Sequence, residues 1–68
     1  IGHDRADKQT QDLIKAYALE HFEIGAYTSL YTYATAIGDY ETAALADEIR
    51  AEEEMAAMKL QRFIPQVA

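Results

Sequence analysis

Two glutamates stand at positions where the spacing of the chain calls for apolar side chains. Glu20 interrupts one helical stripe of apolar residues and Glu53 interrupts another. The first stripe contains Leu13, Tyr17, Ile24, Tyr27, Tyr31 and Ala34, and the second contains Ala46, Ile49, Ala56, Leu60 and Phe63. An ionised carboxylate in a helix-bundle core is costly unless it is paired, hydrogen-bonded or bound to a metal. The placement therefore makes metal binding the first functional hypothesis.

Two more glutamates lie beside these on a helical wheel. Glu23 is about 60° from Glu20, and Glu52 lies across the core line from Glu53. In an antiparallel hairpin, residues equally far from the turn face each other, and Glu23 and Glu53 lie about 15 and 14 residues from the turn at 38–39. The sequence therefore predicts four carboxylates at one level. Clusters of hard oxygen ligands suit iron, manganese, magnesium or calcium.

A solvated charged face is the alternative interpretation of the same residues. Glutamate is a good helix former, so the run 52–54 does not by itself require a ligand. Lys15 or Arg50 could pair with some of these carboxylates. His21 lies about 100° from Glu20 on the wheel, which favours an interfacial or solvent-facing histidine over a metal ligand.

The elements that must position these residues are two long helices. Apolar residues recur every three or four positions from about residue 8 to residue 37, which predicts one helix after a polar lead-in over residues 1–7. Gly38 follows at the position typical of a helix C-terminus, and Asp39 is a suitable N-cap for the next helix.

The second helix is predicted from about residue 40 to residue 63 or 64, and Pro65 ends it. The expected fold is all-α, a single antiparallel helical hairpin within residues 1–68. The chain starts at Ile1 rather than at a methionine, which suggests that it is part of a longer product.

A lone hairpin would leave one apolar face in water. The stable solution is a four-helix bundle, formed either by two copies of the chain or with a missing half of a parent chain. In either case the partner must be a second pair of helices.

Composition excludes several classes of partner. The net charge is −6 and the six Lys and Arg residues are scattered, which disfavours nucleic acid and anionic membrane surfaces. No apolar run approaches the roughly 20 residues that span a bilayer. We therefore expect a cytoplasmic protein. The chain has no cysteine, so disulfides and thiolate metal sites are absent, and no nucleophile–base pair or phosphate loop supports hydrolase chemistry.

A short motif gives the carboxylates a further context. Residues 20–27 follow the pattern E-H-x-E-I-x-x-Y, and Ala34, Gly38, Ala43-Ala44-Leu45 and Glu52-Glu53 follow further along the chain. Over residues 13–60 this arrangement resembles the second half of the YciE/YciF ferritin-like family. The resemblance implies a ferritin-like four-helix bundle and a role in bacterial stress. It also implies a carboxylate-bridged dinuclear site, usually assigned to iron, with manganese or another divalent cation as an alternative.

The resemblance assigns Glu20 and Glu23 to the acidic pair of the third helix of the bundle, and Glu52 and Glu53 to that of the fourth. Which of Glu52 and Glu53 is the main ligand stays open. The usual Glu-x-x-His of ferritin-like proteins is missing, because Met55 stands three residues after Glu52 and an alanine three residues after Glu53. This narrows the expected function from ferroxidase to metal binding, and leaves open whether the protein is an enzyme.

The family normally has two more helices. A homodimer could replace them and gather up to eight carboxylates about a two-fold axis. The rival hypothesis from another class is a structural oligomerisation hairpin without a metal site.

Overall fold

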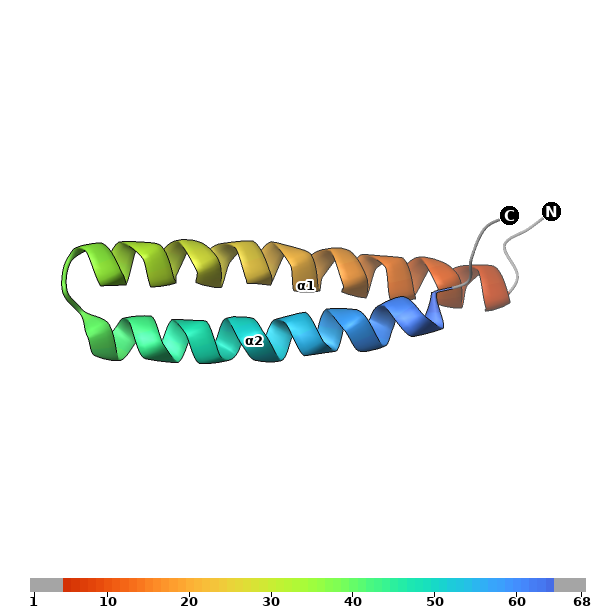
Figure 1. The fold of residues 1–68 in the computed structure, drawn as a ribbon. Coiled ribbons are helices and arrows are strands. Elements are labelled where there is room, and N and C mark those ends of the chain that lie inside the picture. The colour runs from red at the N-terminus through yellow and green to blue at the C-terminus, as the bar shows by residue number, and fades with distance from the viewer. Residues whose placement is uncertain (1–4, 65–68) are drawn as a thin grey trace.

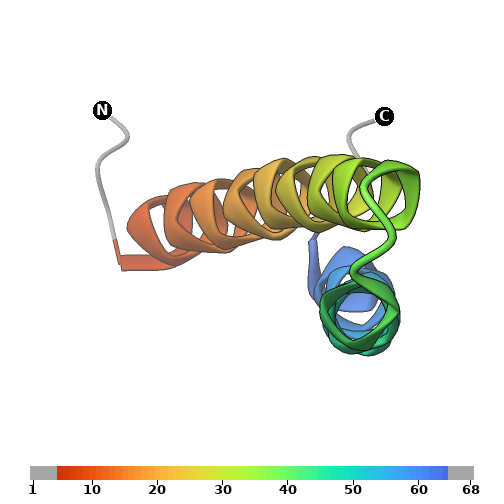
Figure 2. The ribbon, with the colours of Figure 1, turned by 90° about the vertical axis from the view of Figure 1, so that its left-hand side faces the viewer.

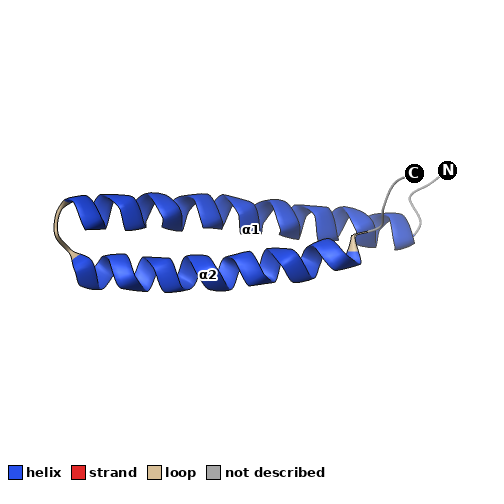
Figure 3. Cartoon of the chain, in the orientation of Figure 1, coloured by secondary structure: helices blue, strands red, loops and turns tan. Residues whose placement is uncertain are grey.

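The computed structural model describes residues 5–64 and shows two antiparallel α-helices joined by a tight turn (Figure 1). Helix α1 spans Arg5–Ala36 and helix α2 spans Tyr40–Phe63. The helices run side by side in a body of 55 × 19 × 17 Å. The described residues contain no strand, as Figure 3 shows by colour. The predicted all-α hairpin is confirmed, whereas the larger bundle stays a prediction.

Helix α1 begins about three residues earlier than the apolar pattern indicated. Residues 5–7 were expected in the polar lead-in, but they are helical. A helix that is already nucleated extends through polar residues as long as no glycine or proline interrupts it. Apolar periodicity cannot reveal such an extension. His3, also in the predicted lead-in, lies outside the described residues.

The turn follows the chemistry of Gly38 and Asp39. Gly38 has a φ of 81°, in the left-handed region that disfavours other residues. Its N–H donates to Thr35 O at 3.2 Å, and the Asp39 N–H donates to Ala34 O at 2.9 Å. These two bonds form a Schellman motif, which satisfies the last carbonyls of α1.

Asp39 then starts the second helix. Its Oδ1 accepts a hydrogen bond from Thr42 N at 3.1 Å, and the Thr42 hydroxyl donates to Asp39 Oδ2 at 2.6 Å. These bonds lower the pKa of Asp39, the hydroxyl bond most. The predicted N-cap is confirmed.

Helix α2 ends at Phe63, one of the two predicted ends. Ile64 has φ −79° and ψ 122°, an extended conformation, and its N–H donates to Gln61 O at 3.4 Å. An extended backbone is what a following proline favours. Pro65 itself lies outside the described residues.

The interface between the helices is a seam of small side chains. Ala34, Ala43, Ala46 and Ala57 are the buried apolar residues of the described chain, each at most 4% exposed. Alanine at these positions lets the two helices approach closely. No large side chain in the described range is fully buried. Among the described residues, no helix is long and apolar enough to cross a membrane.

Candidate metal centre

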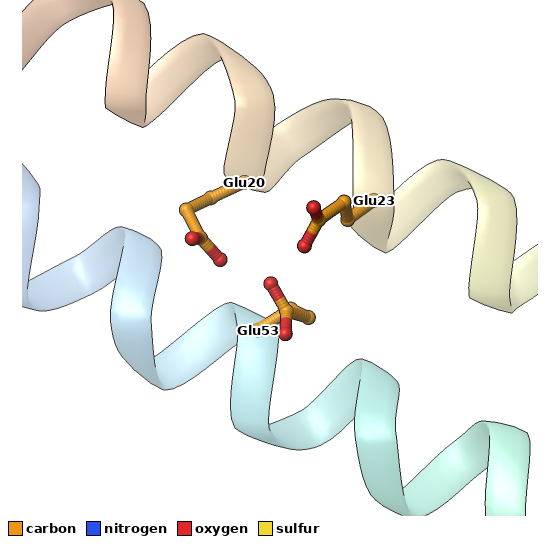
Figure 4. Close-up of side chains that lie close together, drawn as sticks. All are labelled: Glu20, Glu23 and Glu53. Carbon is orange, nitrogen blue, oxygen red and sulfur yellow. The ribbon is translucent and has the colours of Figure 1, made fainter.

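Three glutamates meet between the two helices at mid-length (Figure 4). Glu20 and Glu23 come from α1, one turn apart, and Glu53 comes from α2. One carboxylate oxygen from each residue lies within 4.8 Å of the other two. All three side chains are partly buried. The prediction that carboxylates from both helices share one level is confirmed for these three.

One oxygen of this group has no partner. Glu20 Oε2 is buried and accepts no hydrogen bond. An unsatisfied buried acceptor is costly, and a carboxylate oxygen more so than a neutral one. A cation bound at this point would supply the missing partner.

Among the described residues, the basic side chains that form ion pairs do so with carboxylates other than these three. The guanidinium of Arg50 donates to Asp47 Oδ1 at 3.0 Å and contacts Glu54 Oε1 at 2.8 Å. Lys8 pairs with Asp12 at 3.7 Å. Within the part of the chain that the structure describes, no ion pair reaches Glu20, Glu23 or Glu53. The expected pairing of Arg50 with one of the glutamates in the run 52–54 is confirmed at Glu54 and does not extend to Glu53.

Contacts among these carboxyl groups raise the pKa values of Glu23 and Glu53. The pKa of Glu53 is raised, mainly by hydrogen bonding with Glu20. Partial burial and the negative charges of Glu20 and Glu52 also raise this pKa, whereas hydrogen bonding with Glu23 lowers it. The pKa of Glu23 is raised by hydrogen bonding with Glu53, by partial burial and by the negative charge of Glu53. Without a cation, the group therefore favours taking up protons.

The donor set fits a hard divalent cation. Three carboxylates offer only oxygen atoms, the ligands preferred by magnesium, calcium and manganese and accepted by iron in carboxylate sites. With metal–oxygen bonds near 2.1 Å, ligand atoms on opposite sides of one ion lie about 4 Å apart. A separation of up to 4.8 Å therefore requires only a small inward movement of the side chains.

The fourth predicted ligand lies outside the group. Glu52 is exposed and is not among the three converging carboxylates. Its charge still contributes to the raised pKa of Glu53. In the second helix Glu53 therefore faces α1 and Glu52 lies beside it, whereas the choice of the main metal ligand between them stays a prediction.

His21 does not join the carboxylates either. It is exposed, and its ring packs edge-on against Tyr17 with 4.5 Å between ring centroids and an interplanar angle of 73°. This agrees with the expectation of a flanking histidine.

One comparison with known proteins finds a match. A family model described as a domain of unknown function, DUF892, matches residues 1–68. No curated protein and no solved structure shows a significant match.

Proposed function

The chain belongs to the DUF892 family, and from this premise we propose that it is a ferritin-like protein that binds a divalent metal through Glu20, Glu23 and Glu53. The buried, unpartnered oxygen of Glu20 within a group of three carboxylates carries the proposal. Such a group is stable as ionised carboxylates only when a cation balances its charge. The resemblance to the YciE/YciF proteins supports iron as the first choice and manganese as the second.

The residues of this chain define what the centre does. Glu20 and Glu53 supply negative charge at the helix seam, and Glu23, one turn along α1, supplies a third oxygen. The surrounding helices hold these oxygens near one another before binding, which lowers the entropic cost of ordering them. Bound iron would supply one-electron redox chemistry.

We propose binding rather than ferroxidase turnover. The Glu-x-x-His that supplies a nitrogen ligand in ferritin-like proteins is absent, and exposed His21 lies on the flank. A dinuclear centre needs more ligands than these three, so its remaining ligands come from a second pair of helices. Those helices belong either to a second copy or to the rest of a longer chain. The stress-related role and the cytoplasmic location expected from the sequence stay predictions.

Metal titration of chelator-treated protein tests the proposal. We expect stoichiometric binding of Mn²⁺, and of Fe²⁺ without oxygen, with a rise in melting temperature because the ion binds only the folded chain. Glu53→Gln should weaken Mn²⁺ binding at least about tenfold, since even the loss of a group that only orients a ligand costs that much. Calorimetry measures both effects.

Glu48→Gln is the matched control, because Glu48 is an exposed glutamate on the same helix. It should bind Mn²⁺ as the unaltered chain does. Absence of stoichiometric metal, together with unchanged or higher thermal stability of Glu53→Gln, would support the structural hairpin instead. A colourless protein stabilised by Ca²⁺ or Mg²⁺ and not by Fe²⁺ would indicate a carboxylate site without redox function.

A further inference from the structure

Two methionines and a histidine border two adjoining hollows at the surface of the hairpin. The larger hollow, of about 270 Å³ between the helices, is lined by His21 from α1 and Met58 from α2 among other residues. The smaller hollow, of about 190 Å³, is lined by Met55 and Met58 together with two basic side chains of α2. Met58 borders both hollows, so it connects the imidazole of His21 with the thioether of Met55.

The positions of these residues along the helices agree with this arrangement. Met55 and Met58 are three residues apart on α2, which makes them neighbours on one face of the helix. His21 lies about 17 residues before the turn at 38–39, and Met55 and Met58 lie about 16 and 19 residues after it. Antiparallel helices of equal rise therefore place His21 at a level between the two methionines.

All three side chains are open to solvent. Met55 and Met58 are 61% and 57% exposed, and His21 is exposed as well. The ring of His21 packs edge-on against Tyr17, which lines the same hollow, and this contact restrains the orientation of the imidazole. Viewed from the turn, the described chain is one pair of helices with no third element beside them (Figure 2). An ion from solvent therefore has access to all three side chains.

The donor atoms of this set differ in kind from those of the carboxylate group. The thioether sulfur of methionine is soft and polarisable, and soft sulfur ligands select copper(I). Imidazole nitrogen also suits copper. The three glutamates offer only hard oxygen atoms, and none of them lines either hollow. The two donor sets therefore favour different metal ions.

The charges around the methionines favour an ion of low charge. Lys59 and Arg62 line the smaller hollow with the methionines. Glu54 lines the larger hollow, but its Oε1 already contacts the guanidinium of Arg50 at 2.8 Å. Repulsion by the basic groups increases with the charge of the bound ion, so a divalent cation is disfavoured more strongly than a monovalent one. Bonding to sulfur depends on polarisability and needs no negative charge on the ligand.

We infer that Met55, Met58 and His21 form a second metal site, which binds copper(I). Two thioether sulfurs and one imidazole nitrogen make up the ligand set, with Met58 at its centre. Methionine is unbranched and has several rotatable bonds, so both sulfurs can turn toward one ion without movement of the helices. This site is separate from the carboxylate group and does not depend on the function proposed for it.

Competition for copper(I) with the coloured indicator bicinchoninate, without oxygen and with ascorbate as reductant, tests the site. The unaltered chain should withdraw one copper(I) per chain from the indicator. Met58→Leu keeps the volume of an exposed side chain and should stay folded, as circular dichroism will check. It should bind copper(I) at least about tenfold more weakly, and so should His21→Gln. His3→Gln removes the other histidine of the chain and should bind copper(I) as the unaltered chain does.

NMR of the methionine methyl groups gives a second readout that needs no variant. The ε-methyl signals of Met55 and Met58 should both shift with Ag⁺, a soft ion of the same charge that does not change its oxidation state. Unshifted methyl signals, or an indicator that keeps its copper, would overturn the inference.

Comparison with Mn²⁺ separates this site from the carboxylate group. Met58→Leu should bind Mn²⁺ as the unaltered chain does, and Glu53→Gln should bind copper(I) as the unaltered chain does. Equal loss of copper(I) binding in Met58→Leu and Glu53→Gln would place copper at the glutamates and refute the second site. A chain that binds copper(I) through Met58 but binds no Mn²⁺ would refute the proposed function and leave the copper site standing.

Discussion

Three adjacent glutamates on α2 have three different environments. Glu53 faces α1 and joins Glu20 and Glu23, while Glu54 lies on the opposite side and contacts Arg50 at 2.8 Å. Glu52 is exposed and lies outside this group. Successive residues on a helix point about 100° apart, so identical side chains meet different neighbours. Residue type alone therefore does not identify which glutamate joins the group.

The raised pKa of Glu53 also predicts how the stability of the metal-free chain depends on pH. Its pKa in the folded chain is raised above the ordinary value of 4.5, so folding favours the protonated form. The stabilising contribution of that protonation is fully present below the unfolded pKa and is lost as pH rises through the folded pKa. In chelator, we expect the unaltered chain to lose stability over this range. Glu53→Gln should lose less and be the more stable form at pH 7.

Chemical denaturation at several pH values measures this difference. Glu48→Gln, an exposed substitution on the same helix, serves as the control and should follow the unaltered chain. With saturating Mn²⁺ the order should reverse at pH 7, because the metal stabilises only a complete ligand set. If the curves of Glu53→Gln and the unaltered chain stay parallel in chelator, repulsion within the group does not affect folding.

At the scale of the elements, the turn sets how the two helices meet. Gly38 reverses the chain with its positive φ, and Asp39 caps α2 through Thr42. The hydrogen bonds of the Schellman motif, to Thr35 O and Ala34 O, close the turn within Gly38 and Asp39. A turn this short keeps α1 and α2 in one register, and this register brings Glu53 opposite Glu20.

The two described glycines should respond oppositely to the same substitution. Gly38→Ala should destabilise the hairpin by about 1–2 kcal/mol, because φ is 81° there, a conformation unfavourable for alanine. No atom lies within 4 Å of the added methyl group, so this cost comes from the backbone conformation alone. Gly25→Ala, inside α1 with equally open space, should stabilise it by roughly 0.5–1 kcal/mol. Urea denaturation of both variants measures the pair. A loss of stability in Gly25→Ala would mean that something packs on that position.

At the scale of the whole molecule, the described part of the chain buries few apolar side chains. Its buried apolar residues within the described range are four alanines, while large apolar side chains such as Phe22, Tyr40 and Phe63 remain exposed. Small domains without a disulfide or metal depend on association.

The melting temperature should therefore rise with protein concentration. A folded dimer in equilibrium with unfolded monomers is stabilised by mass action. Thermal scans in chelator over a hundredfold range of concentration measure this. A melting temperature independent of concentration in the unaltered chain would indicate that the hairpin folds as a monomer.

Local features of this protein could be predicted from the sequence by itself. The periodicity of apolar residues determined two helices, and Gly38 with Asp39 determined the turn between them, because these signals act within one or two helical turns. The level of Glu20, Glu23 and Glu53 followed from counting residues away from that turn. The start of α1 at Arg5 was missed, because polar residues in a helix leave no periodic signal.

Only the tertiary structure decided which glutamates face each other. The sequence placed Glu52 and Glu53 on either side of the core line, and either could have pointed at α1. Packing of the alanine seam around Ala46 and Ala57 sets the rotation of α2 about its own axis. That rotation places Glu53 beside Glu20 and leaves Glu52 outside the group. The rotation of one helix against another depends on contacts between residues far apart in the chain, and no local pattern encodes it.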